Sequence, residues 1–384
     1  MRGSGVRRAG RRGAMVVAAS AVVAVASAAG TMTALGEDGA DDRRTARHDA
    51  PRTDPSAAGS AGSPLPSPSA TSATPSGSPS PSASPTPSAT RKPRAAAAPA
   101  RLHHHPESQV LDWVRDHPDD PRRAVVESRI ASRPAAVWFA DYAPGTLTSR
   151  VRAVTSGAAA QGRVPVLVAY AIPDRDCGGA SEGGAPDLDA YAGWIDRFAA
   201  GLGSRETVVI LEPDSIAQTD CLSADRRDAR LAALARAGRV LRAANPKARV
   251  YYDAGHSHWN SPAHQAALLR QAGAASSAGI FSNVSNFRRT ADEIVYDRQV
   301  LDLLGGPPGL GAVIDTSRNG NGAPADGEWC DPDGRTIGRA PTLDTGEPRI
   351  DGYLWVKLPG ESDGCKGAAG EFSPSYAYEL ASSS

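Results

Sequence analysis

Seven short apolar runs recur between residues 136 and 357 of this 384-residue chain, and they limit its possible folds more than any other feature. The runs cover 136–139, 164–170, 207–211, 250–253, 279–283, 312–315 and 353–357. The stretches after Asp187 and over 225–244 have the spacing of amphipathic helices; Asp187 can cap the first, and Pro246 stops the second. Alternating strands and helices favour a parallel sheet, so we predict an α/β fold, either a barrel or an open sheet.

The first 101 residues are unsuited to a packed core. Residues 55–90 carry no charge and consist almost wholly of Pro, Ser, Thr, Ala and Gly. Such a segment cannot bury enough apolar surface to offset its ordering entropy. We therefore expect 37–101 to be a disordered linker or stalk, and 102–384 to be the folded unit.

Residues 1–36 have the pattern of an export signal. Five arginines among the first twelve residues precede an uncharged segment, 13–36, whose apolar centre is 15–25. Small residues at 26–28 resemble a cleavage site. The alternative is a signal anchor, although the segment is rich in Ala, Gly and Ser and only weakly hydrophobic. We expect a protein that is secreted or tethered to the cell surface.

Charge is distributed unevenly although the whole chain is neutral. Residues 1–101 hold 13 basic and 6 acidic side chains, whereas 102–384 hold 29 and 36. Phosphate backbones require a positive surface, so an acidic folded unit argues against a nucleic-acid partner. It suits a neutral ligand such as a sugar.

Four cysteines lie in the folded unit, and none has a partner in a C-x-x-C motif. This spacing argues against zinc and favours two disulfides in an oxidising compartment. Four cysteines allow three connectivities. We predict the sequence-local pairs, Cys177–Cys221 and Cys330–Cys365.

Polar segments follow six of the apolar runs, where a β/α barrel builds its active site. Their carboxylates are Asp174, Asp176, Asp214, Asp253, Asp315, Glu361 and Asp363. Crowding raises the pKa of some carboxyl groups, and a protonated carboxyl can act as a general acid. Glycoside hydrolysis requires such an acid with a second carboxylate as base or nucleophile.

Two other interpretations of these residues remain. Each aspartate could simply cap a helix or pair with Arg175 or Arg318. A metallohydrolase could use Asp253, His256 and His258, completed by Asp176 or Asp315. We expect neither metal nor cofactor, and we interpret the three histidines at 103–105 as an exposed loop.

Tryptophans near strand ends can stack on the apolar face of a sugar ring. Four lie in such places: Trp138, Trp259, Trp329 and Trp355. Trp194 lies on the helix after Asp187 and is expected in the core.

Together these segments resemble glycoside hydrolase family 6, the cellobiohydrolases and endoglucanases, over about 136–370. The similar motifs include Ile-Pro-Asp-Arg-Asp-Cys at 172–177, Glu-Pro-Asp-Ser at 212–215, Asp-Ala-Gly-His at 253–256 and the segment 354–364. The resemblance implies a distorted seven-stranded β/α barrel and hydrolysis with inversion. It also implies the two disulfides given above.

The resemblance assigns catalytic roles. Asp214 would be the general acid, and Asp176 would raise its pKa and shuttle protons. Asp363 would be the candidate base, acting through a water chain. Tyr170 would distort the sugar ring at the cleavage point, and Ser181 would help to hold the attacking water.

A second group of residues would bind the glucan. Lys357 and Glu361 would hold the sugar next to the cleavage point, and Asp253 would tune charge or bind substrate. The others expected to line the cleft are Trp138, His256, Trp259, Asn283 and Trp329.

The sequence thus predicts a β-1,4-glucan hydrolase. Because the folded unit is compact, we expect an open cleft and cleavage of internal bonds by a monomer that needs no protein partner. The alternatives are a cellobiohydrolase of the same family and a catalytically silent glucan-binding protein of the cell surface.

Overall fold

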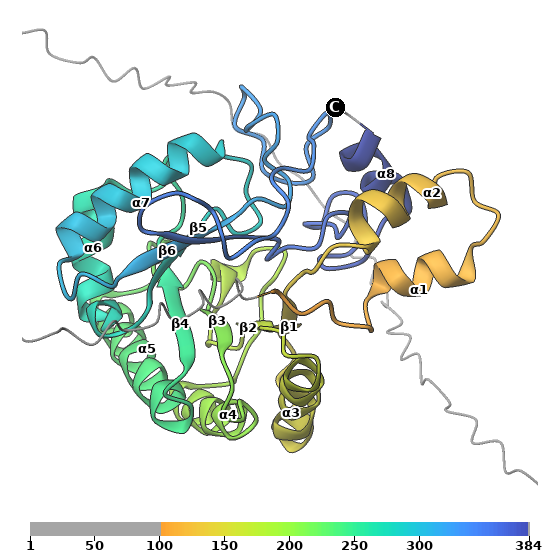
Figure 1. Cartoon of the computed structure of the whole chain (residues 1–384). Coiled ribbons are helices and arrows are strands. Elements are labelled where there is room, and N and C mark those ends of the chain that lie inside the picture. Colours follow the sequence, from red (N-terminus) through yellow and green to blue (C-terminus); the bar gives the residue numbers. More distant parts are fainter. Residues whose placement is uncertain (1–100, 383–384) are drawn as a thin grey trace, which may run out of the picture. The chain divides into compact units, whose positions relative to one another are not determined.

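We describe residues 101–382 from a computed structural model of the chain. Seven parallel strands form one sheet in which each strand pairs with its neighbours in sequence, in the order β1 to β7 (Figure 1). The strands are β1 Val137–Phe139, β2 Val166–Ala169, β3 Thr207–Leu211, β4 Ala248–Asp253, β5 Gly279–Ser282, β6 Gly311–Asp315 and β7 Ile350–Leu354. The expected distorted seven-stranded β/α barrel is confirmed.

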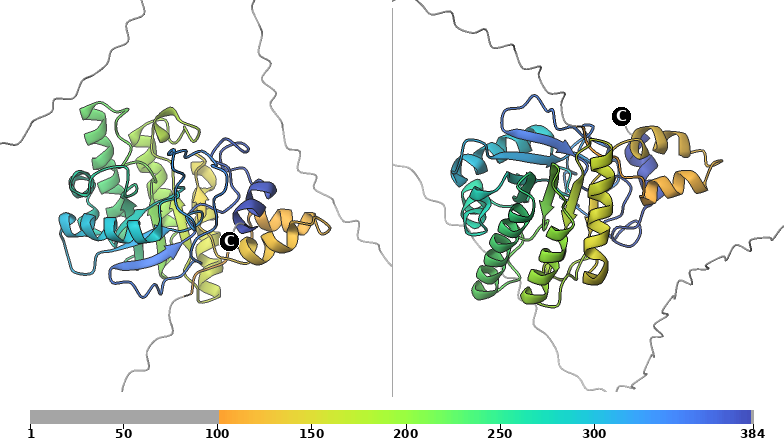
Figure 2. Two further views of the ribbon diagram at one scale, coloured as in Figure 1. Left: turned by 90° about the horizontal axis from the view of Figure 1, so that it is seen from above. Right: turned by 60° about the horizontal axis from the view of Figure 1, so that its bottom comes forward.

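Five helices cover the outside of the sheet: α3 Pro144–Ala160, α4 Leu188–Ala200, α5 Ala224–Ala244, α6 Pro262–Gln271 and α7 Thr290–Leu304. Figure 2 shows α3, α4 and α5 side by side along one stretch of the sheet. Asp187 caps α4 as predicted, because its carboxylate accepts a 2.7 Å hydrogen bond from Ala190 N. The two predicted helices are therefore present, within a residue or two of their expected ends.

Alternate strand residues fill the two faces of the sheet. Side chains such as Val168, Ile210 and Tyr251 are fully buried and pack together inside the barrel. Their sequence neighbours Leu167 and Val209 point outward and pack under the helices. The interior is therefore filled with apolar side chains, and polar chemistry is confined to the strand ends.

The barrel is distorted between β1 and β7. These two strands do not pair, and two isolated hydrogen bonds join them instead: Ala136 N donates to Trp355 O at 2.9 Å, and Trp138 Nε1 donates to Val356 O at 2.7 Å. Beside this gap pack α1 Gln109–Asp116, α2 Arg123–Val126, a π-helical turn at Glu127–Ala131 and α8 Pro374–Ser382 (Figure 1). Short 3-10 turns lie at Asp176–Gly178 and Ala274–Ser276.

The last strand lies earlier than predicted, at Ile350–Leu354 instead of 353–357. The backbone N–H groups of Val356 and Lys357 donate to the Asp315 carboxylate, at 3.3 and 3.1 Å, and not to a neighbouring strand. A buried side chain thus ends the strand.

Both predicted disulfides are confirmed: Cys177 bonds to Cys221, and Cys330 bonds to Cys365. The predicted signal at 1–36 and the linker at 37–101 lie outside the described residues, apart from Arg101. Within 101–382, no helix combines the length and apolar character that a membrane span requires.

Candidate active site

A cleft of about 1260 Å³ lies at the carboxyl ends of the strands. It is larger than most small-molecule pockets, which span roughly 300–1,000 Å³. Eleven of the thirteen predicted site residues line it: Trp138, Tyr170, Asp176, Ser181, Asp214, His256, Trp259, Trp329, Lys357, Glu361 and Asp363. Asp253 and Asn283 do not.

Asp214 occupies the turn after β3 in a left-handed backbone conformation, with φ of 68°. Burial raises the pKa of its carboxyl group well above the ordinary value, and the negative charges of Asp253, Asp176 and Asp363 raise it further. Burial and these three charges are the causes of the shift, and within 101–382 no hydrogen bond to this carboxyl group opposes them. A carboxyl group in such surroundings keeps its proton to higher pH than an ordinary aspartate does, and it can act as an acid.

Asp253 is buried near Asp214 and does not line the cleft, so of its two expected roles the geometry favours charge tuning over substrate binding. Its side chain is 1% exposed, and its carboxylate accepts hydrogen bonds from Ile216 N, Ala217 N and Gly255 N at 2.8–3.0 Å. The backbone thus uses both oxygens. What Asp253 offers the site is its charge, which raises the pKa of Asp214.

Asn283, which we expected to bind the sugar, is also fully buried and does not line the cleft. Its Nδ2 donates to Asp315 O at 2.8 Å, and its Oδ1 accepts from Arg288 N at 2.9 Å. Its φ of 65° turns the chain at the end of β5. Asn283 therefore ties the loop after β5 to the end of β6.

The loop after β2 carries Asp176 and Ser181 and is folded onto itself. Asp176 Oδ2 accepts a 2.7 Å hydrogen bond from Ser181 N. Arg175 donates to Ser181 O at 2.8 Å, to Ala140 O at 2.7 Å and to Tyr170 O at 2.5 Å. These bonds hold both predicted residues at the wall of the cleft, beside Tyr170.

Tyr170 lies between an arginine and a tryptophan. The guanidinium carbon of Arg175 is 4.5 Å from the centre of its ring, and the ring meets Trp138 edge to face at 5.3 Å. Burial raises the pKa of the Tyr170 hydroxyl, and the charges of Asp214 and Asp176 raise it further. The hydroxyl therefore stays protonated beside the acid.

Glu212 is a functional residue that our sequence analysis did not assign. Its side chain is fully buried, and Oε2 accepts hydrogen bonds from Ala171 N at 2.9 Å and Ile172 N at 3.0 Å. Burial raises its pKa to about 7. It fixes the segment that starts at Tyr170, and the available signal was a glutamate directly after an apolar run.

Asp363 is held in a buried ion pair. Arg318 donates to both of its oxygens, at 2.8 and 3.0 Å, and Lys357 Nζ lies 3.5 Å from Oδ1. Asp331 N also donates to Oδ2 at 3.2 Å. Asp363 therefore makes the pairing with Arg318 that the sequence left open.

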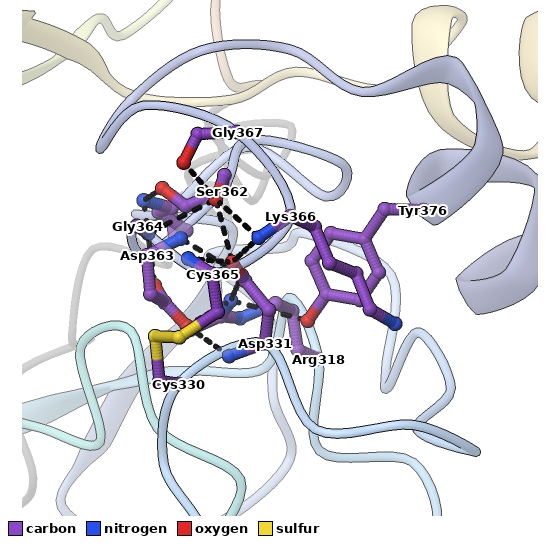
Figure 3. The surroundings of a disulfide bond; sticks show 11 residues. Arg318, Cys330, Asp331, Ser362, Asp363, Gly364, Cys365, Lys366, Gly367 and Tyr376 are labelled. Atoms are coloured by element: carbon purple, nitrogen blue, oxygen red, sulfur yellow. Dashed lines mark hydrogen bonds and ion pairs between the residues drawn. A yellow bond between two sulfur atoms is a disulfide. The ribbon is translucent and has the colours of Figure 1, made fainter.

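Asp331 secures the loop that carries Asp363 (Figure 3). Its carboxylate accepts hydrogen bonds from four donors, at 2.5–3.0 Å: Asp363 N, Cys365 N, Lys366 N and Ser362 Oγ. The Cys330–Cys365 disulfide joins the same two segments. The local sequence does not reveal this role of Asp331, because its partners are three backbone N–H groups and one hydroxyl about thirty residues away.

Lys357 and Glu361 lie close together on one wall. Lys357 Nζ donates to Ser362 O at 2.9 Å. Burial raises the pKa of Glu361 to about 7, although the charges of Lys357 and Arg318 oppose the shift. Gln109 Nε2, from α1, approaches Glu361 Oε1 at 3.4 Å.

His256 and Trp259 also line the cleft, and their ring centres are 5.3 Å apart. Burial lowers the pKa of His256 to about 3, helped by Arg288 and His258, so its imidazole is neutral. Trp329 stands at the rim and is 58% exposed. A neutral imidazole and flat rings suit uncharged sugars.

The other two tryptophans are buried. Trp355 is 2% exposed and its Nε1 donates to Arg339 O at 3.0 Å, so its expected place near the sugar site is wrong. It packs against the N-terminal helices instead. Trp194 is fully buried, which confirms that it belongs to the core.

The metallohydrolase hypothesis finds no support in residues 101–382. No group of three or more His, Cys, Asp or Glu side chains in this range is arranged as metal ligands. His256 Nδ1 instead accepts a 3.1 Å hydrogen bond from His258 N. The oxygens of Asp253 and Asp315 are occupied by backbone donors.

A carboxyl group with a raised pKa, a second carboxylate in the same cleft and tryptophans along the walls define a glycoside hydrolase built on a β/α barrel. Residues 98–383 match the family model "Glycosyl hydrolases family 6". The chain belongs to that family, as the sequence motifs predicted.

Three similar proteins carry endoglucanase names. Endoglucanase 1 of Streptomyces sp. (strain KSM-9) is 54% identical over 74% of this chain and 79% of its own length. Endoglucanase A of Thermobispora bispora is 48% identical over 75% of this chain and 64% of its own length. The solved endoglucanase Cel6 of Mycobacterium tuberculosis, in complex with methyl-cellobiosyl-4-deoxy-4-thio-β-D-cellobioside, is 40% identical with a TM-score of 0.69, covering 74% of this chain and 97% of that one.

Proposed function

We propose that this protein hydrolyses internal β-1,4-glucosidic bonds of cellulose or a related β-glucan, with inversion at the anomeric carbon. The observation that carries the proposal is the placement of Asp214, whose raised pKa and position in the cleft suit a general acid. The family match and the endoglucanase names of similar proteins support the substrate class.

In the proposed reaction, Asp214 gives its proton to the glycosidic oxygen, and the bond between that oxygen and the anomeric carbon breaks. Water attacks the carbon from the opposite face, and its proton passes toward Asp363. Both oxygens of Asp363 already accept hydrogen bonds, so we place it at the end of a water chain. Asp176 keeps the pKa of Asp214 high, and Tyr170 presses on the sugar ring.

The rim of the cleft supports internal cleavage. Trp329, Glu182 and Glu328 line the cleft and are exposed to solvent, so a long chain can reach the site from the side. A cellobiohydrolase would instead release cellobiose from chain ends. A long soluble glucan separates the two activities when solution viscosity and released reducing sugar are measured together. Internal cuts lower the viscosity before much reducing sugar appears.

We further propose that the enzyme acts outside the cell. The signal-like segment 1–36 and the two disulfides support export. In this arrangement 37–101 would be a stalk, and 102–384 the catalytic domain.

The proposal is tested by proton NMR of the purified protein digesting cellopentaose, recorded within minutes of mixing. We expect α-anomer products first, and we expect Asp214→Asn to abolish turnover while glucan binding remains. The matched control is Asp196→Asn, a surface residue paired with Arg236, which should retain full activity. Binding without any product would favour the silent glucan-binding protein, and β-anomer first would contradict inversion.

A further inference from the structure

The cleft continues beyond Lys357 and Glu361 into a region that the proposed reaction does not use. Its walls come from segments that precede β1, and we call them the N-terminal extension of the cleft. The extension comprises His104, His105, Glu107, Gln109, Ala131 and Arg133, all of which line the same cavity as the catalytic residues.

Hydrogen bonds fix the extension to the wall that carries Glu361. Gln109 Nε2 donates to Gly370 O at 2.7 Å, and Gln109 Oε1 accepts from Phe372 N at 2.9 Å. The same Nε2 approaches Glu361 Oε1 at 3.4 Å. The start of α1 is thus tied to the loops around Glu361, which makes the extension continuous with the site.

A second hydrogen bond joins two segments of the N-terminal extension. A ring nitrogen of His104, Nε2, lies 2.8 Å from Ala131 O, which joins the histidine segment to the π-helical turn. This π-helical turn packs against α1, α8 and Trp355 in one apolar cluster. The histidine segment is therefore held in place by a hydrogen bond and by packing, and it is not the exposed loop that we predicted.

His105 supplies unused hydrogen-bonding capacity there. Neither ring nitrogen has a hydrogen-bond partner among residues 101–382; Nδ1 is enclosed by the protein, so Nε2 is the nitrogen that a ligand in the cleft can reach. Burial lowers the pKa of His105, against the opposing charge of Glu107, so its ring is neutral at neutral pH. A neutral imidazole can both donate and accept, as a sugar hydroxyl can. A sugar hydroxyl in the cleft can therefore form a hydrogen bond with Nε2 of His105.

We propose that the N-terminal extension binds one further glucosyl unit of the β-1,4-glucan chain, next to the unit beside Lys357 and Glu361, with His105 hydrogen bonding to it. This inference rests on the proposed function, because it extends the same substrate along the same cleft. The cleft volume of about 1260 Å³ leaves room for a chain of sugars. Binding at a remote unit can accelerate the reaction of long substrates.

The test compares two substrate lengths in the full-length enzyme. We expect His105→Ala to lower the ratio of kcat/KM for cellohexaose to kcat/KM for cellotetraose by about 2- to 10-fold, the loss of one neutral hydrogen bond. The sites of cleavage in cellohexaose, read from product sizes, should shift as well. His105→Gln keeps a donor and an acceptor and should restore most of the ratio.

His264→Ala is the matched control, since His264 is exposed on α6 and does not line the cleft. An unchanged ratio in His105→Ala would overturn the inference, and so would an equal loss on both substrates, which would indicate damage to the catalytic centre or the fold. A wild-type enzyme that cleaves neither substrate would overturn the proposed function instead.

Discussion

Asp363 and Arg318 form a two-point ion pair inside the protein, with Nη1 to Oδ2 at 2.8 Å and Nη2 to Oδ1 at 3.0 Å. Arg318 is fully buried, and it also donates to Ser285 O. Arg318 therefore orients the candidate base through both of its oxygens, and together with Lys357 it balances the charge of Asp363.

Removing that arginine should destabilise the fold. Arg318→Met would leave the carboxylate of Asp363 buried beside Lys357 alone, and breaking a buried pair costs about 3–5 kcal/mol. We expect the free energy of unfolding in urea to fall by this amount. Arg298→Met, which breaks a surface pair with Glu347, should cost less than about 1 kcal/mol. Equal losses of unfolding free energy in the two variants would show that the buried pair stabilises the fold no more than the surface pair does.

The charge of Asp176 should set the upper pH limit of activity. Asp214 must be protonated to act as an acid, so activity falls as pH rises through its pKa. Asp176→Asn removes one of the charges that raise this pKa, so the high-pH limb of kcat/KM should move to lower pH. Asp174→Asn is the control, because Asp174 pairs with Arg226 and does not act on Asp214. If the high-pH limb of kcat/KM did not move in Asp176→Asn, Asp176 would not control the pKa of Asp214.

Glu212 should matter as a hydrogen-bond acceptor and not as a charge. Glu212→Ala would leave Ala171 N and Ile172 N without their acceptor, at a cost of about 1–3 kcal/mol each, and would displace Tyr170. Glu212→Gln can place its carbonyl oxygen where Oε2 accepts both bonds. We expect near-normal thermal stability and kcat for the glutamine variant and a loss of both for the alanine variant. If both variants lost activity equally, the charge would be what matters.

Asp331 and the neighbouring disulfide should have separable effects. The disulfide closes a loop with a sequence separation of 35, so Cys330→Ser with Cys365→Ser should cost about 3–4 kcal/mol of stability. Asp331→Ala leaves the N–H groups of Asp363, Cys365 and Lys366 without their acceptor, so it should also cost stability. Unlike the loss of the disulfide, it should lower kcat on the order of 10- to 100-fold, because the Asp363 carboxylate loses its position. Thermal unfolding and kcat of both variants check this. A greater loss of kcat in the double serine variant would reverse the assignment.

Much of the fold could be predicted because buried parallel strands appear in the sequence as short apolar runs. The positions of β3 and β6, and the cap of α4 at Asp187, follow from local sequence. The end of β7 could not, because the Asp315 side chain, far away in sequence, takes the backbone donors of Val356 and Lys357.

The candidate site divides in the same way. Residues after strand ends were correctly brought to one cleft, since strand ends meet at one edge of a barrel. Whether a side chain then faces the cleft depends on backbone donors and acceptors from other elements. Asp253 turns inward to Ile216 and Ala217, and Asn283 turns inward to Asp315, and neither partner is visible in the local sequence.

Two further carboxyl groups, Glu293 and Asp297, are fully buried on the inner face of α7 beneath the loop that carries His256 and Trp259. Glu293 accepts a 3.1 Å hydrogen bond from Ser257 N, and Asp297 accepts a 2.9 Å bond from Ser282 Oγ. Burial raises the pKa of Glu293 to about 7. Burial and the charge of Glu293 raise the pKa of Asp297 well above its ordinary value.

These raised pKa values make the fold less stable as pH rises. The folded protein binds more protons than the unfolded chain between pH 4.5, the ordinary value for glutamate, and about 7, so stability is full below this window and is lost through it. The glutamine side chain in Glu293→Gln stays neutral, so this variant should lose less stability as pH rises. Its free energy of unfolding should exceed that of wild type by about 1–3 kcal/mol at pH 8 and differ little at pH 4. Urea unfolding at both pH values measures it, with the exposed Asp292→Asn on the same helix as control. Parallel pH dependences of wild type and Glu293→Gln would show that Glu293 is ionised at no cost, in contradiction to its burial.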